Sequence, residues 1–319
     1  MKKLSEFSPS TKGLLYVLAG AVTISAAPLF VKVVDAGPNM IACWRMIWGS
    51  LTLLGVALYR GEKIIPGRAM LITMIWSGAF FSLDLIFWHQ SILYVGPGLA
   101  TILTNFQVFF LAIYGAFFLK ERMGWRMKLS MPMVLVALWL VLDVRITEFN
   151  MDMGIGLATG ILSALFYAGF VLTLRYSQTT TGMLSPTANI GVISFISIFF
   201  TGFAGIVSGE DLVVHGLENN LLLIASGVGV QALGWLLLSK GLPLMTATRA
   251  GLLMMLQPTL SFAWDILLFG RPTSVTGFLG AAGALMAISM GVSDRAASQE
   301  KGTSLEDPEE TDDQQQPVK

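Results

Sequence analysis

Ionisable side chains interrupt an otherwise apolar stretch between Ala69 and Val95. Asp84 stands near its middle, Trp88 follows one helical turn later on the same face, and His89 is offset in angle and depth. A carboxylate there can carry a proton, balance a cationic ligand, or pair with an arginine such as Arg45. A histidine titrates near neutral pH, although a position close to the end of such a stretch is more typical of helix packing. Asp84 and His89 are therefore the candidate proton-coupling residues, and we do not expect them to form a catalytic dyad.

Further polar and aromatic residues stand inside other long apolar segments. A charge at the centre of a membrane costs at least about 2.5–3.5 kcal/mol on insertion scales, so such residues are functional candidates. We expect amides and indoles to line a cavity for a small amphiphilic molecule. The alternative is that each amide only joins neighbouring helices, a contact worth about 0.6–2 kcal/mol. The candidate substrate-binding residues are Trp44, Arg45, Asp84, Trp88, Asn105, Gln107, Gln231, Trp235 and Gln257.

The composition identifies the class of protein that must position these residues. The chain has 319 residues, of which 54% are hydrophobic and 13% charged, whereas soluble domains carry roughly 25% charged residues. Apolar runs of about 20 residues recur, and each is long enough to cross a hydrocarbon core about 30 Å thick. The single Cys43 excludes an internal disulfide framework. The zero net charge and the lack of a basic block give no indication of nucleic-acid binding, and we expect no metal and no cofactor.

The apolar runs predict an all-α membrane protein with ten transmembrane helices, because helices satisfy every backbone polar group in lipid. Short links at Gly96–Pro97 and Leu242–Pro243 predict two antiparallel hairpins. The expected spans are 14–34, 39–59, 69–94, 98–119, 129–143, 154–175, 187–207, 220–240, 246–269 and 274–292.

The distribution of lysine and arginine predicts that both termini are cytoplasmic. With residues 1–13 inside, only Lys32, Arg45, Arg145 and Arg271 fall on outer segments, out of 20 basic residues. We expect the first span to be retained rather than cleaved as a signal peptide. The acidic, polar segment 293–319 is expected to be a disordered cytoplasmic tail.

The two halves of the chain repeat weakly. A constant offset places Ala100 on Ala250, Leu103 on Leu253 and Gln107 on Gln257. We therefore predict two five-helix repeats, 14–143 and 154–292. An odd number of spans inverts the second repeat, and inverted repeats are typical of transporters that bind substrate near the midplane between the halves.

Two hairpin segments carry a family resemblance. They are DLIFWHQSILYVGPGLATILTNFQVFFLAIYGAFFLKER from Asp84 and GLPLMTATRAGLLMMLQPTLSFAWDILLFGRP from Gly241. Both resemble hairpins of EamA-type transporters in the drug/metabolite transporter superfamily, and the resemblance covers roughly 14–292. It implies ten helices in two halves and transport of a drug or metabolite.

The chain departs from the family pattern at two positions. Val108 stands where the family usually has a proline in the fourth span, which predicts a straighter helix, whereas Pro258 is kept in the ninth. Arg271 stands where the family has a glutamate after the ninth span, so the cap-like contact of that glutamate is not expected here.

We interpret the chain as a secondary-active transporter that exports a small metabolite or amphiphilic drug across the cytoplasmic (inner) membrane by alternating access and exchange with protons. Uptake or exchange of a metabolite is the alternative, followed by a membrane-embedded lipid-modifying enzyme. No GxxxxGK[ST] motif is present for ATP hydrolysis, and a channel would need charged rings or filter loops. The expected partners are the substrate and the lipid bilayer, with the chain a monomer or homodimer.

Overall fold

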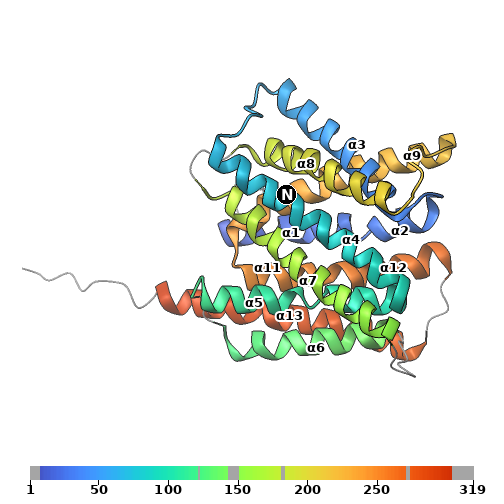
Figure 1. Cartoon of the computed structure of the whole chain (residues 1–319). Coiled ribbons are helices and arrows are strands. Elements are labelled where there is room, and N and C mark those ends of the chain that lie inside the picture. Colours follow the sequence, from blue (N-terminus) through green and yellow to red (C-terminus); the bar gives the residue numbers. More distant parts are fainter. Residues whose placement is uncertain (1–7, 121–122, 143–150, 181–183, 271–273, 304–319) are drawn as a thin grey trace, which may run out of the picture.

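The structure is a computed structural model that describes residues 8–120, 123–142, 151–180, 184–270 and 274–303. Every regular element in those ranges is a helix (Figure 1). Within them, seven helices are long and apolar enough to cross a membrane, and two shorter apolar helices accompany them. The chain is therefore an all-α membrane protein. The count of ten spans and the side on which each terminus lies stay predictions, and Arg271 lies outside the described residues.

The helices follow the expected spans in order, and the first begins earlier than expected because Ser8 caps it by accepting from Thr11 N. The last helix continues to Thr303, into the segment expected to be disordered. The elements are α1 Pro9–Ile24, α2 Ala27–Val33, α3 Pro38–Tyr59, α4 Arg68–Thr104, α5 Gln107–Phe117, α6 Trp125–Leu142, α7 Met151–Ser177, α8 Pro186–Val207, α9 Leu217–Ala225, the π-helix η2 Ser226–Gly234, α10 Trp235–Gly241, the 3-10 turn η3 Leu242–Leu244, α11 Ala247–Met254, α12 Leu256–Phe269 and α13 Val275–Thr303.

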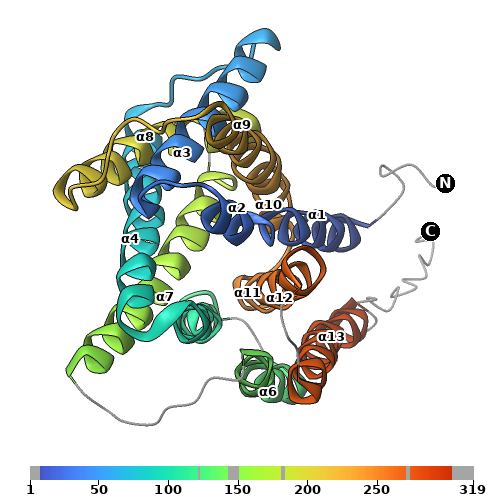
Figure 2. The same ribbon diagram turned by 90° about the vertical axis from the view of Figure 1, so that its right-hand side faces the viewer.

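Helix α4 folds back on itself. Asp84 and Thr104 both bond to the hydroxyl of Ser163, at 2.7 and 3.0 Å, although a straight helix would hold them about 30 Å apart. Figure 2 shows α4 curving at its lower end toward the chain that follows. The helical backbone is continuous through Gly96–Pro97, where the sequence predicts a link, and a proline there removes one backbone donor and bends the helix. The expected span 98–119 therefore begins inside α4.

Two related helices are broken at corresponding places. The chain leaves helical geometry at Asn105–Phe106, between α4 and α5, and at Met255, between α11 and α12. Pro258 accounts for the second break because it removes a donor from the first turn of α12. The prediction that Val108 straightens the first was wrong. Phe106 N bonds to Leu103 O at 3.0 Å, so a tight turn ends α4 without a proline.

A third break divides the first expected span at Ser25–Ala26, between α1 and α2. Two side chains of α12 donate hydrogen bonds to Ser25 at this break. Ser261 Oγ donates to the Ser25 carbonyl at 2.7 Å, and Trp264 Nε1 donates to Ser25 Oγ at 2.8 Å. The break is therefore a bonded feature of the fold, and it ties the start of the chain to its last quarter.

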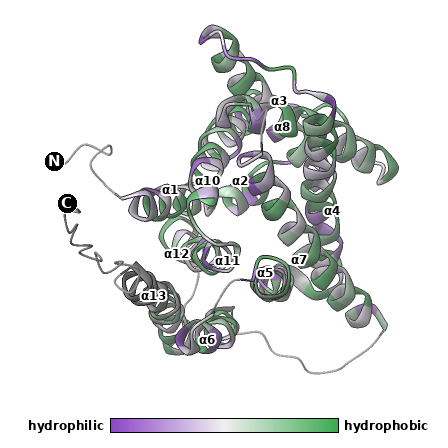
Figure 3. Cartoon of the chain, turned by 90° about the vertical axis from the view of Figure 1, so that its left-hand side faces the viewer, coloured by the Kyte–Doolittle hydropathy of each residue, from purple (hydrophilic) through white to green (hydrophobic). Residues whose placement is uncertain are grey.

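The helix pairs have a two-fold pattern. Helix α1 packs on η2 and α10, as α7 packs on α4; α3 packs on α8, α5 on α11, and α6 on α13. Exchanging the two halves of the chain leaves this set of pairs unchanged, as expected for two related repeats. Figures 2 and 3 show α6 and α13 side by side at the edge of the bundle, with α11 and α12 nearer its middle. The boundaries of the repeats stay a prediction.

Apolar side chains cover much of the outside of this bundle. Figure 3 shows hydrophobic residues along most of its helices. Large side chains such as Leu51, Phe199, Phe203 and Leu279 are exposed along helix faces. A soluble monomer rarely shows contiguous apolar surface on this scale, whereas a membrane protein meets lipid with it. The polar residues described next lie inside.

Candidate functional site

Asp84 lies on α4 and is buried against α7. Its Oδ1 accepts a hydrogen bond of 2.7 Å from Ser163 Oγ, and only 6% of the residue is exposed. The Ser163 hydroxyl also contacts Thr104 Oγ1 at 3.0 Å, from the returning limb of α4. A hydroxyl can donate to a carboxylate or accept from a carboxylic acid. The position can therefore hold Asp84 in either protonation state.

Arg45 faces this carboxylate from α3 without touching it. The arginine is buried, and its Nε atom has no hydrogen-bond partner. Its charge is close enough to interact with Asp84 and His89, yet among the described residues the two charges of Arg45 and Asp84 form no contact ion pair. The static pair considered as an alternative role for Asp84 is thus not formed, and a guanidinium in the interior lacks a bonded anion.

An aromatic wall adjoins the carboxylate. Tyr167 is one turn after Ser163 on α7, and its ring meets Trp235 edge-on at 6.2 Å. Trp235 also meets Phe81 at 5.0 Å and Phe170 at 4.8 Å. Gln257 Nε2 approaches Tyr167 Oη at 3.5 Å, the limit of a hydrogen bond. The fold thus brings the predicted residues Asp84, Trp235 and Gln257 together around Tyr167.

Two of the other predicted amides, Gln231 and Gln107, are buried and only partly bonded. Gln231, on η2, donates to Ser194 Oγ at 2.9 Å, while its Oε1 has no partner. Gln107, the first residue of α5, is 1% exposed, and its Oε1 also lacks a partner. Asn105 is buried at the break between α4 and α5. An unsatisfied buried polar atom costs about 1–3 kcal/mol, so Gln107 and Gln231 offer acceptors that a ligand can satisfy.

His89 belongs to a separate network. Its Nδ1 contacts Asn39 Oδ1 at 3.2 Å. Asn39 Nδ2 in turn donates to Glu210 Oε1 at 2.7 Å, and Met40 N donates to Glu210 Oε2 at 2.8 Å. Glu210 therefore caps the start of α3, and the pairing of carboxylates with helix N-termini is favourable. His89 bonds to this cap and not to Asp84, in accord with the expectation that the two form no dyad.

Trp44 and Trp88 lie toward the same end of the bundle as His89. Trp44 Nε1 donates to Leu212 O at 3.1 Å, which fixes the indole to the link after α8. Trp88 is half-buried, and its ring lies 5.3 Å from that of His89. Trp44 is thus bonded to the link that carries Glu210, and Trp88 packs on His89.

Sequence reasoning missed Ser163 and Tyr167, two α7 residues whose hydroxyl groups contact predicted site residues. A signal was present in the small residues Gly156 and Gly160 of the same helix. Gly160 packs against Leu103 and Ser91 of α4, so its face points to the site. Extending that face by helical steps of three and four reaches Ser163 and Tyr167.

Comparison with known proteins agrees with this fold. Residues 11–143 match the model of the EamA-like transporter family. A crystal structure of a protein with 15% sequence identity aligns with a TM-score of 0.74 over 89% of this chain and 99% of the other chain. No curated protein matches the chain by sequence. The crystal structure shows the shared fold, and residues 11–143 of this chain are similar to the EamA-like transporter family.

Proposed function

We propose that this membrane protein is a secondary-active transporter that exports a small metabolite or amphiphilic drug in exchange for protons. The observation that carries the proposal is the interior cluster around Asp84. It combines a carboxylate without a contact cation and a buried arginine without a contact anion, and elsewhere in the interior the amide oxygens of Gln107 and Gln231 have no partners. Such groups cost folding free energy when unsatisfied, and a polar substrate between the helices would satisfy them.

The broken helices support an alternating-access mechanism. Discontinuous helices near the midplane form the binding sites of many secondary transporters, because their exposed backbone groups can contact substrate. Here α4 and α5 break at Asn105–Phe106, and α11 and α12 break at Met255. Gln107 and Gln257 follow these breaks directly. We infer that the two breaks are the points about which the halves rearrange around bound substrate.

Asp84 supplies a simple basis for exchange with protons. Ser163 can bond to its charged or its neutral form. A cationic group of the substrate and a proton would therefore compete for the same carboxylate, and competition produces exchange. Arg45 would bind an anionic group of the same molecule. The direction of net transport then follows the gradients, so uptake or exchange of a metabolite uses the same residues.

Purified protein in sealed vesicles tests the proposal. Ligands that raise the melting temperature are first selected from amino acids, amines, sugars and nucleosides, and are then measured by counterflow. We expect accumulation of unchanged substrate that depends on a pH gradient and is lost when the vesicles are permeabilised. Chemical conversion of the compound in leaky vesicles would instead indicate an enzyme, and counterflow that ignores the pH gradient would remove proton coupling.

A further inference from the structure

A cavity lined by both polar and apolar side chains lies between helix ends, away from Asp84. Its volume is about 530 Å³, within the range of small-molecule sites. The predicted topology places this end of the bundle in the cytoplasm. The lining residues come from α1, from the link between α7 and α8, and from the region of α10 and η3, and they are Tyr16, Gln178, Leu184, Ser185, Pro186, Ser239, Lys240 and Pro243.

The polar groups of this cavity include donors without hydrogen-bond partners. Gln178 is 7% exposed and Ser239 is fully buried, and neither Gln178 Nε2 nor Ser239 Oγ has a hydrogen-bond partner. Lys240 follows Ser239 and brings an ammonium group that forms no ion pair with any described residue. Two unbonded donors and a cation match the acceptor oxygens of a carboxylate.

An aromatic side chain stands beside the cation. Lys240 Nζ lies 6.0 Å from the centre of the Tyr16 ring. The two residues come close because α1 and α10 meet at glycines. A Cβ on Gly241 would lie 2.7 Å from Val17 Cγ2 and 2.9 Å from Gly13 O. With Leu184, Pro186 and Pro243, Tyr16 makes the remaining wall apolar, so the cavity suits a ligand with a ring and an acid group.

The donors are held by the helix ends around them. Asn189 Nδ2 of α8 donates to Ser177 Oγ at 2.9 Å, which fixes the end of α7 next to Gln178. Ser185 caps α8 by accepting from Ala188 N at 3.1 Å, and its hydroxyl also donates to Glu62.

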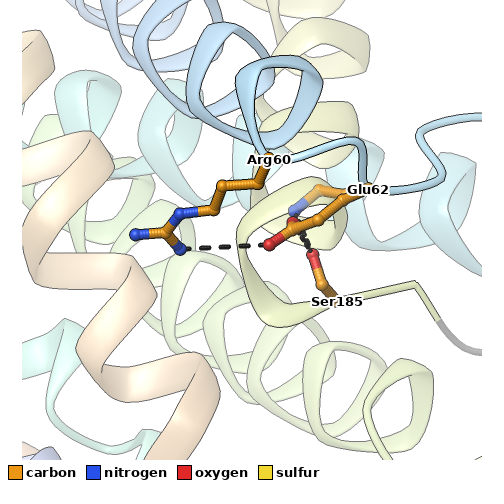
Figure 4. Close-up of polar contacts among 4 residues, drawn as sticks. Arg60, Glu62 and Ser185 are labelled. Carbon is orange, nitrogen blue, oxygen red and sulfur yellow. Dashed lines mark hydrogen bonds and ion pairs between the residues drawn. The ribbon is translucent and has the colours of Figure 1, made fainter.

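Figure 4 shows the lining residue Ser185 together with Glu62 and Arg60, whose Nη1 lies 3.9 Å from Glu62 Oε1. Glu62, which is bonded to the lining residue Ser185, therefore has a cation and a hydroxyl donor beside it. The negative charge of Glu62 is therefore partly offset, which reduces its repulsion of an anion bound at Lys240.

We propose that this cavity binds an aromatic carboxylate, through Lys240, Gln178 and Ser239 at the acid group and Tyr16 at the ring. The cavity is then the loading site at which a substrate of this class meets the transporter before it reaches Arg45. The loading role rests on the proposed function, whereas binding does not.

Binding of indole-3-acetate, with indole-3-acetamide as the neutral isostere, tests the proposal. The full chain in phosphatidylcholine nanodiscs is titrated by calorimetry, so that no anionic lipid competes. We expect the acid to bind at least about tenfold tighter than the amide, equal to about 1.4 kcal/mol. In the Arg45→Met background, where the acid has no second cation to bind, Lys240→Gln should remove this preference, and Gln178→Leu should weaken acid binding about threefold or more. Lys63→Gln, an exposed lysine changed in the same way, is the matched control and should bind as the parent does.

Equal binding of acid and amide overturns the proposal, as does a Lys240→Gln protein that keeps the preference. If Lys240→Gln does not fold, Gln178→Leu replaces it, and unchanged acid binding by that variant overturns the proposal. Asp84→Asn separates this proposal from the proposed function, because it should keep the preference for acid over amide that Lys240→Gln removes while losing transport. If counterflow continues in a variant whose cavity no longer prefers the acid to the amide, only the loading role of the cavity is contradicted.

Discussion

Helix α4 carries two buried ionisable residues, Asp84 and His89, and the hydrogen bonds around them differ in how many groups they satisfy. At His89 each group has a bonded partner, in a chain that runs through Asn39 to the Glu210 carboxylate. At Asp84 one hydroxyl is bonded to the carboxylate, while the guanidinium of Arg45 faces it without contact. A satisfied network stabilises the fold, whereas an unsatisfied one retains free energy that a ligand can use.

The origin of the partners explains the difference. The link after α8 supplies Glu210, and a link has few constraints on where its side chains bond. Around Asp84 every neighbour stands on a helix, so completing the hydrogen bonds requires a helix to move or a ligand to bind. The two regions therefore predict opposite results of substitution: loss of function at one and loss of stability at the other.

Asp84→Asn should have the largest effect on transport. The amide oxygen can still accept from Ser163, so the fold is kept, but the charge and the proton site are lost. We expect pH-driven counterflow to fall roughly 100-fold, equal to about 2.7 kcal/mol. The counterflow rate is measured on correctly inserted protein whose melting temperature equals that of the parent. A parental rate would reduce Asp84 to a packing residue.

Arg45→Met should weaken substrate affinity about tenfold and leave stability equal or higher. The guanidinium has no contact anion, so its removal from the interior relieves a desolvation cost. Ligand titration and thermal unfolding of the same preparation measure both effects. A strong fall in melting temperature would show that Arg45 is a structural group, and the comparison between the two regions would fail.

Glu210→Gln should show the opposite pattern. The substitution weakens charge-assisted bonds from Asn39 and Met40 at the start of α3, which are worth about 1.5–3 kcal/mol. We expect a lower melting temperature and counterflow within about twofold of the parent. Exchange lost at an unchanged melting temperature would assign Glu210, and with it His89, to the transport mechanism.

Val108→Pro should have the smallest effect, below about 1 kcal/mol. Val108 is in the first turn of α5, where a proline is tolerated, and the helix is already broken before it. Leu111→Pro, one turn later, is the control and should cost about 3 kcal/mol or more. Equal destabilisation by both changes would mean that α5 is continuous with α4 in the membrane.

The sequence predicts the helical class and the order of the helices well, because each apolar run is long enough to be recognised alone. Of the three breaks, it indicates only the one at Met255, through Pro258. Ser25 and Phe106 look ordinary in a single sequence, and their turns depend on donors from helices distant in the chain or on local packing. The site is predicted in part for the same reason. Asp84 and Arg45 are conspicuous in apolar segments, whereas Ser163 and Tyr167 are ordinary membrane residues that gain importance only through contact.

The folded-back helix α4 has a consequence for how the chain enters the bilayer. Its two limbs are joined through Gly96–Pro97 without an intervening loop, so they must insert together as one hairpin. Ser163 lies 79 residues after Asp84 and is synthesised much later. During that interval the carboxylate crosses into the membrane without the partner it has in the finished protein. Protonation lowers the cost of that passage, so the residue we assign to proton exchange would also be protonated during biogenesis.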